Sequence, residues 1–171
     1  MLLIPHPSTA IATVQSIDCA VWQDVGRWHF RYLVEGADNL VIPDPAGPSR
    51  ADNLWKTTCF EAFVGLGGEA YLEFNFSPSG EWAAYRFDRC REGMRDEPCD
   101  VEVWLEGGES WIAVEAAVKA ASLEPGLVLG LSAVIDERES KSYWALSHPN
   151  GPPDFHDRTC FTALLANIAH S

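Results

Sequence analysis

The sequence predicts an all-β protein: an antiparallel sandwich of two sheets, of jelly-roll type, with about nine strands. Three observations indicate this fold class. Apolar and polar residues alternate in many short segments, a helical period is almost absent, and Gly, Pro and Asp separate the segments. The 171 residues contain no linker, repeat or low-complexity tract, so we expect one domain over residues 1–171.

The predicted strands follow one another along the whole chain. Residues 27–35 alternate strictly, with Trp28, Phe30 and Tyr32 on one face. Residues 42–53, rich in Pro, Gly, Asp and Asn, predict a long loop rather than a domain boundary. Three consecutive strands are expected within residues 54–88. Further strands are expected at residues 100–107, 111–119, 126–136, 142–146 and 159–166.

The middle strand of residues 54–88 has two contrasting faces. Leu72, Phe74 and Phe76 share one face, while Glu73 and Asn75 share the other. A sheet face with carboxylate, amide and aromatic groups suits a small polar ligand with apolar patches, and sugars are common ligands of this kind. Alternatively, these polar residues simply face water, as one side of an antiparallel sheet often does.

The turn at residues 77–80 decides which side chains join this polar face. Its sequence, Ser-Pro-Ser-Gly, favours a type I turn followed by a glycine bulge. That register pairs Phe76 with Trp82 and Glu73 with Tyr85, so Tyr85 joins the polar face. A tight two-residue loop would instead place Trp82 and Arg86 there. We favour the first register on turn chemistry.

Composition excludes several function classes. The net charge of −13 and only 12 Lys and Arg residues argue against nucleic-acid binding, which depends on basic side chains. No apolar run is long enough to span a bilayer, so no membrane partner is expected. The start, MLLIPHPSTA, lacks the pattern of a signal peptide, and five scattered cysteines favour free thiols. We therefore expect a cytoplasmic protein with reduced cysteines.

Several of these residues together resemble a known family. The run from Trp55 through Glu61 to Asn75, followed by the turn at residues 77–80, resembles family nine carbohydrate-binding modules and the related DOMON domains. The stretch 142–166, in which a tryptophan is followed by a Phe-His pair, a turn and a closing strand, resembles the end of that fold. The bacterial, stand-alone DOMON-like branch is the most similar.

The resemblance implies a non-catalytic sugar-binding module. In such modules two aromatic side chains sandwich a sugar ring, and a carboxylate and an amide bind its hydroxyls. Trp55 matches the first aromatic, Glu61 the carboxylate, Asn75 the amide and Trp144 the second aromatic. Glu73 departs from the pattern, because a cationic residue is expected there. The expected pocket therefore comprises Trp55, Glu61, Glu73, Asn75, Tyr85, Trp144 and His156, with a saccharide or sugar-like molecule as partner.

Three other functions remain open at this point. Some DOMON domains bind haem through Met and His, for which Met94 with His148 or His156 are the candidates. A structural or protein-interaction sandwich would bind no small ligand. Paired carboxylates such as Glu61 and Glu73 could hydrolyse glycosides, and this is the least favoured reading.

No metal site is predicted, because no defined ligand spacing is present. Relatives sometimes bind calcium, and its candidate oxygen ligands are Asp136, Glu137, Asp154 and Asp157. Cys59 could act as a nucleophile only with a histidine base nearby, so a buried thiol is the preferred reading.

Overall fold

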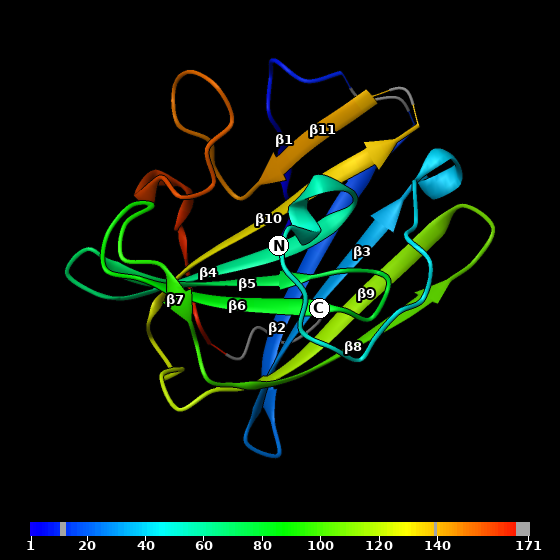
Figure 1. Cartoon of the computed structure of the whole chain (residues 1–171). Coiled ribbons are helices and arrows are strands. Elements are labelled where there is room, and N and C mark those ends of the chain that lie inside the picture. Colours follow the sequence, from blue (N-terminus) through cyan, green and yellow to red (C-terminus); the bar gives the residue numbers. More distant parts are fainter. Residues whose placement is uncertain (11–12, 139, 167–171) are drawn as a thin grey trace.

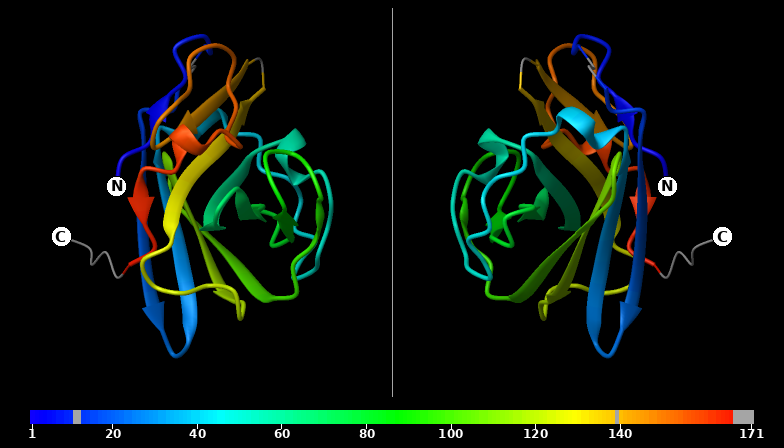
Figure 2. Two further views of the ribbon diagram at one scale, coloured as in Figure 1. Left: turned by 90° about the vertical axis from the view of Figure 1, so that its left-hand side faces the viewer. Right: turned by 90° about the vertical axis from the view of Figure 1, so that its right-hand side faces the viewer.

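The computed structural model describes residues 1–10, 13–138 and 140–166 and shows two antiparallel sheets packed face to face (Figures 1 and 2). The eight-stranded sheet contains β1 (Ile4–Pro5), β11 (Ser140–Ala145), β10 (Val128–Glu137), β4 (Cys59–Gly67), β5 (Ala70–Phe76), β6 (Trp82–Phe87) and β7 (Arg95–Asp96), in that order, with β12 (Ala163–Leu164) also paired to β10. The four-stranded sheet contains β2 (Ser16–Asp24), β3 (Arg27–Glu35), β9 (Trp111–Lys119) and β8 (Asp100–Gly107). The predicted β-sandwich is therefore confirmed.

The main core lies between the two sheets. The inward face of β5 carries Leu72, Phe74 and Phe76, all fully buried, as the alternation of the sequence predicts. Phe30 of β3 stacks on Phe74 and Phe76 with ring centroids 6.5 and 5.7 Å apart. These contacts join the two layers through large apolar surfaces, which is the principal stabilising term for such a fold.

The outer face of the eight-stranded sheet is also covered. A second apolar cluster there includes Phe63, Tyr71, Tyr85, Phe87 and Phe161, all buried. Connecting segments pass over this face, as the view of the front of the sheet shows (Figure 1). The alternative in which the polar residues of β4 and β5 face water is consequently wrong: Glu61, Glu73 and Asn75 are only 3%, 6% and 1% exposed.

The hairpin between β5 and β6 has the register that turn chemistry predicts. Phe76 pairs with Trp82, and Glu73 pairs with Tyr85. Gly80 has a φ of 91°, which favours glycine, and its N–H donates to the carbonyl of Ser77 at 3.0 Å. Ala83, Tyr85 and Phe87 lie on the outer face in this register and are nevertheless buried, because that face also belongs to an apolar cluster.

Two strand predictions are corrected, one for a strand that the sequence analysis omits and one for a strand that is much shorter than expected. Strand β2 was not predicted, although Ile17, Cys19 and Val21 alternate there and are buried. The predicted strand at 159–166 is mostly irregular. It starts inside a 3-10 turn, η3 (Arg158–Cys160), because the carboxylate of Asp157 accepts the N–H of Thr159 at 2.8 Å and caps that turn. Only β12 remains as strand.

Helical structure in the described residues is limited to η3 and two other 3-10 turns, η1 (Ala37–Asn39) and η2 (Leu54–Lys56). None of these is long and apolar enough to cross a membrane. All five cysteines are free, as predicted.

Candidate functional site

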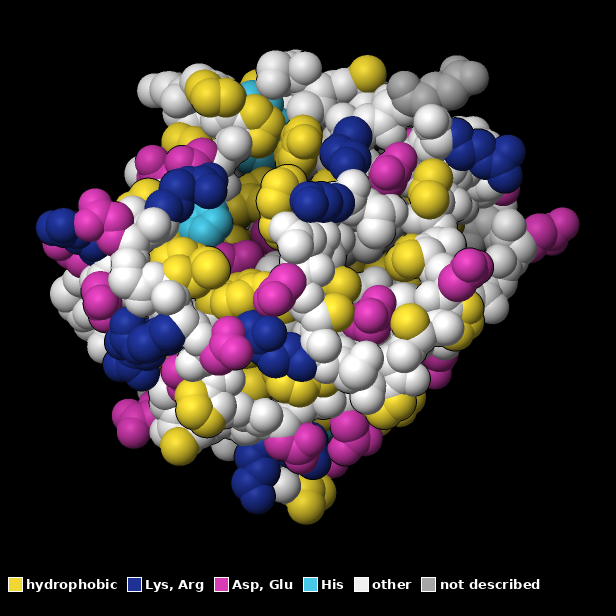
Figure 3. Space-filling model, in the orientation of Figure 1, with side chains coloured by type: hydrophobic (Ala, Val, Ile, Leu, Met, Phe, Trp, Pro, Cys, Tyr) yellow, Lys and Arg dark blue, Asp and Glu magenta, His cyan; other side chains and the backbone are white. Residues whose placement is uncertain are grey.

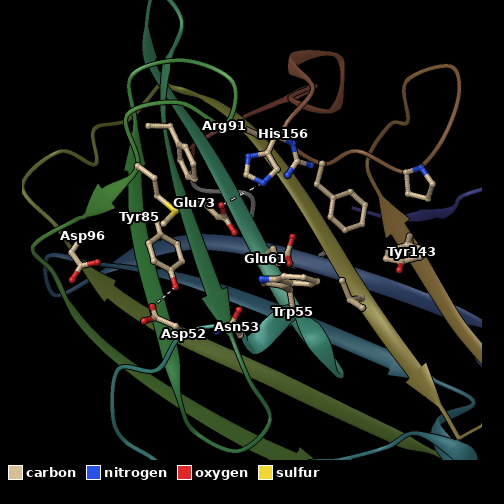
Figure 4. Close-up of a pocket in the computed structure, with 15 residues that line it drawn as sticks. Asp52, Asn53, Trp55, Glu61, Glu73, Tyr85, Arg91, Asp96, Tyr143 and His156 are labelled. Atoms are coloured by element: carbon tan, nitrogen blue, oxygen red, sulfur yellow. Dashed lines mark hydrogen bonds and ion pairs between the residues drawn. The ribbon is translucent and has the colours of Figure 1, made fainter.

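A pocket of about 850 Å³ opens on the outer face of the eight-stranded sheet. In the space-filling view it is a hollow with hydrophobic walls and acidic side chains inside (Figure 3). Three connecting segments, within residues 52–55, 91–96 and 153–156, surround it (Figure 4). The strands contribute Glu61, Glu73, Tyr85, Phe87, Val134 and Tyr143. This size lies within the usual range for small-molecule sites.

Two carboxyl groups form the floor of the pocket, and an amide behind them supports one of the two. Glu61 on β4 pairs with Asn75 on β5, and Glu73 lies two residues before Asn75 on the same face. Register therefore makes Glu61 and Glu73 diagonal neighbours across adjacent strands. Asn75 Nδ2 donates to Glu73 Oε1 at 2.9 Å, and Ser132 Oγ donates to Glu61 Oε2 at 3.2 Å.

The floor carboxyls hold their protons more tightly than ordinary carboxyls. Burial raises the pKa of Glu61 well above its usual value, and the nearby charge of Glu73 raises it further. Burial also raises the pKa of Glu73, against the opposing effects of the Asn75 hydrogen bond and the Arg91 charge. The pair can therefore either donate or accept hydrogen bonds, depending on its protonation state.

His156 covers Glu73 as a neutral imidazole. Arg91 N donates to Tyr71 Oη at 3.1 Å, so the Tyr71 hydroxyl can donate its proton to His156 Nδ1, 2.6 Å away. The ring then carries its own proton on Nε2, 3.6 Å from Glu73 Oε2. Burial, followed by the charge of Arg91, lowers the pKa of His156 to about 4. The contact between His156 and Glu73 is thus not an ion pair near neutral pH.

The mouth of the pocket is aromatic. Trp55 in η2 is 52% exposed and lines the opening. Tyr85 Oη donates to Asp52 Oδ1 at 2.6 Å, and the guanidinium of Arg50 lies 5.2 Å from the Tyr85 ring centroid. The loop before β4 is thereby fixed against β6. Burial and then the hydrogen bond to Asp52 raise the pKa of Tyr85, so its hydroxyl stays protonated.

Most of the predicted site residues meet at this pocket. Trp55, Glu61, Glu73, Tyr85 and His156 all line it. Asn75 is not a lining residue, but its amide supports Glu73 from the same sheet face.

The expected position of Trp144 is corrected. Trp144 is 3% exposed and belongs to the core between the sheets, where its Nε1 donates to Ser142 Oγ at 2.9 Å. Neighbouring side chains of a strand point to opposite faces, so its neighbour Tyr143 lines the pocket instead.

The pocket also contains residues that sequence reasoning missed. Phe87 lies two residues after Tyr85 and shares its face, a signal that was available once the register was chosen. Phe155 belongs to the Phe-His pair already noted before η3. Arg91 and Asp96 lie in the segment after β6 and at β7, where no sequence pattern pointed to the pocket.

The residues present do not fit haem. Met94 and His156 both line the pocket, which is the arrangement that haem binding would need. Both ring nitrogens of His156 already face protein groups, namely Tyr71 Oη and Glu73 Oε2. His148 is not a lining residue, and its Nε2 lies 2.8 Å from the carbonyl oxygen of Ile4. No histidine nitrogen of the described pocket is therefore open to an iron atom.

Three of the four candidate calcium ligands are engaged in other contacts. Glu137 Oε1 accepts hydrogen bonds from Thr13 N and Oγ1. Asp154 Oδ1 accepts from Arg91 at 2.8 Å, and Asp157 caps η3. Across residues 1–10, 13–138 and 140–166, no group of three or more His, Cys, Asp or Glu side chains is placed to hold a metal ion.

The fold and the pocket together describe a β-sandwich with a concave cavity on one sheet face. A solved structure from Bacteroides uniformis ATCC 8492, of a protein described as a "putative carbohydrate-binding protein", is similar, with a TM-score of 0.56 and 16% sequence identity. The similarity covers 85% of this chain and 84% of that chain. At this identity the likeness shows the fold alone. No protein-family model and no curated protein matches the chain, so the DOMON-like resemblance stays a prediction.

Proposed function

We propose that this protein is a non-catalytic module that binds a saccharide or a sugar-like small molecule in the pocket. One observation carries the proposal: the half-exposed indole of Trp55 lies at the mouth of a pocket whose floor carries the buried carboxyl groups of Glu61 and Glu73. An exposed indole beside buried polar groups in a concave pocket offers a ligand both an apolar packing surface and hydrogen-bonding partners.

The chemistry of sugars matches this arrangement. A sugar ring has C–H faces that pack on indole and phenol rings, and hydroxyls that both donate and accept hydrogen bonds. Glu61 and Glu73 can do both when one of them is protonated, and their raised pKa values favour that state. The fold likeness to the Bacteroides uniformis protein supports the same class of ligand.

A thermal-shift screen with mono- and disaccharides tests this function. A ligand that binds only the native state stabilises it and so raises the melting temperature. At a ligand concentration of a hundred times Kd, the free energy of unfolding increases by about 2.7 kcal/mol. We expect Trp55→Ala to abolish the shift. Trp104→Ala is the matched control, because Trp104 on β8 is 45% exposed and lies on the other sheet, outside the pocket.

Two outcomes would overturn the proposal. If no saccharide stabilises the protein, the alternative of a structural or protein-interaction sandwich is favoured. If Trp55→Ala and Trp104→Ala respond equally to a stabilising sugar, that sugar binds somewhere other than this pocket.

A further inference from the structure

The pocket contains two carboxyl groups without a cationic partner. Arg50 binds both of the peripheral acids, Asp52 and Asp96, and the Arg91 guanidinium binds Asp154. Because these arginines are already paired, Glu61 and Glu73 on the pocket floor have no ion pair with an arginine in the part of the chain that the structure describes. Their direct partners Ser132, Asn75 and His156 are neutral groups, and the Arg91 charge that acts on both carboxyls is already paired with Asp154. A ligand would therefore meet net negative charge at the floor whenever these carboxyls ionise.

Two acceptor atoms at this floor, one of them buried, also lack hydrogen-bond partners among the described residues. Glu61 is 3% exposed and lines the pocket, and its Oε1 has no hydrogen-bond partner among the described residues. Asn75 Oδ1 is buried, and it too has no hydrogen-bond partner in the described part of the chain. Buried acceptors normally have a donor, and leaving one unpaired costs about 1–3 kcal/mol. The floor is therefore short of donors, and short of positive charge.

The walls above the floor are aromatic. Trp55, Tyr85 and Tyr143 surround the space into which Glu61 and Glu73 extend (Figure 4), and Phe155 also lines it. The face of an aromatic ring carries partial negative charge and attracts a cation within about 6 Å. Aromatic walls and an acidic floor thus favour the same kind of group.

We propose that the ligand carries a protonated amine in addition to hydroxyl groups, as an amino sugar or another polyhydroxylated amine does, and that this amine binds between Glu61 and Glu73. The inference rests on the proposed function of the same pocket and names its ligand class. An ammonium group has three donors and no acceptor, which matches a floor with unpaired acceptors. Its charge also removes the repulsion between two neighbouring carboxylates. A neutral sugar supplies the donors but not the charge.

Calorimetric titration of matched sugars tests the inference near neutral pH. The probes are glucosamine, galactosamine and mannosamine, each with its N-acetyl derivative and its parent neutral sugar. We expect one of the amines to bind at least tenfold more tightly than its parent sugar. Its N-acetyl derivative, which keeps the nitrogen but loses the charge, should lose that advantage.

Substitutions locate the effect. Glu61→Gln and Glu73→Gln each remove one ionisable carboxyl while keeping the side-chain shape, and both should reduce the amine-to-neutral ratio towards one. Glu102→Gln should leave the ratio unchanged, because Glu102 is an exposed residue of the other sheet, paired with Arg27. Circular dichroism of each variant checks that it is folded.

The outcomes separate this inference from the proposed function. If neutral sugars bind as tightly as their amines, the amine inference is overturned and the sugar-binding function stands. If both glutamine variants keep the full preference for the amine, the amine does not bind at the floor and the inference is also overturned. If no probe binds, both proposals are overturned.

Discussion

Trp55 and Trp144 have opposite environments, although both belong to the sequence pattern that suggested a sugar site. Trp55→Ala should change the free energy of unfolding by no more than about 0.5 kcal/mol, because its side chain is half exposed. Trp144→Ala should cost about 3–5 kcal/mol, because it leaves a cavity between the sheets. Denaturant unfolding of the two variants measures both. A large loss of stability for Trp55→Ala would place that side chain in the core and contradict its role at the pocket.

The buried carboxyl of Glu61 gives a prediction for pH. Its pKa is raised in the native state, so the native protein keeps a proton that the unfolded chain releases above the ordinary glutamate pKa of about 4.3. The contribution of Glu61 to stability is thus complete below that pH and is lost as pH rises through the native pKa. The loss is about 1.4 kcal/mol for each pH unit over which only the native state stays protonated.

Glu61→Gln removes this loss. We expect the stability of the variant relative to the wild type to increase steadily as pH rises above about 4.3. The lowered pKa of His156 acts in both proteins and cancels in the difference. Chemical denaturation at several pH values checks the trend, with the exposed Glu102→Gln as control. A difference independent of pH would show that Glu61 has an ordinary pKa.

At the scale of the element, the loop of residues 42–53 is held on the β5–β6 hairpin. Ala46 N and Gly47 N donate to the carbonyl of Ser79 at 3.0 and 3.1 Å, and Ala51 N donates to that of Trp82 at 2.9 Å. A Cβ added to Gly47 would lie 2.3 Å from the Gly80 backbone, so the two segments approach as closely as they do only because Gly47 has no side chain.

Gly47→Ala should therefore separate this loop from the hairpin and displace Asp52, which lines the pocket. We expect a loss of at least about 1 kcal/mol of stability together with weaker binding of any ligand that the wild type binds. Gly107→Ala is the control, because a Cβ there would meet its neighbours only at 3.4 Å or more. Unchanged binding in Gly47→Ala would show that the loop position does not shape the pocket.

The strands also show how far the sequence alone could lead. Alternation along β5, together with turn chemistry, correctly placed Glu73, Asn75 and Tyr85 on one sheet face. In β11 the family resemblance selected Trp144 instead of Tyr143, and alternation could not correct that choice. Because this sheet is buried on both faces, an aromatic residue is acceptable at either position, and hydrophobicity cannot tell which one lines the pocket.

The segment around Arg91 and Asp96 could not be predicted for a different reason. These residues lie in irregular backbone and a two-residue strand, β7, where no periodicity relates position to direction. Their place in the site depends on long-range pairing, such as that of Tyr85 with Asp96.

At the scale of the whole molecule, the five thiols report on the integrity of the fold. Cys90 is exposed, while Cys19, Cys59 and Cys160 are buried, and burial raises the pKa of Cys160 to about 12. In the native protein we expect a thiol reagent to label Cys90 first, because the others are less accessible or less ionised. Under denaturing, non-reducing conditions all five should react. Labelling of fewer than five would indicate a disulfide that the structure does not contain.

The order of synthesis matters for a pocket built in this way. The ribosome produces the floor, on β4 and β5, long before residues 153–156, which supply Phe155 and His156. A nascent chain that has not reached His156 holds two acidic side chains that this part of the pocket does not yet cover. Similarly, β1 can pair with β11 only after some 140 residues have been made. Contacts that distant in sequence form late, so the pocket is complete only after residues 153–156 have been made and have folded onto the sheet.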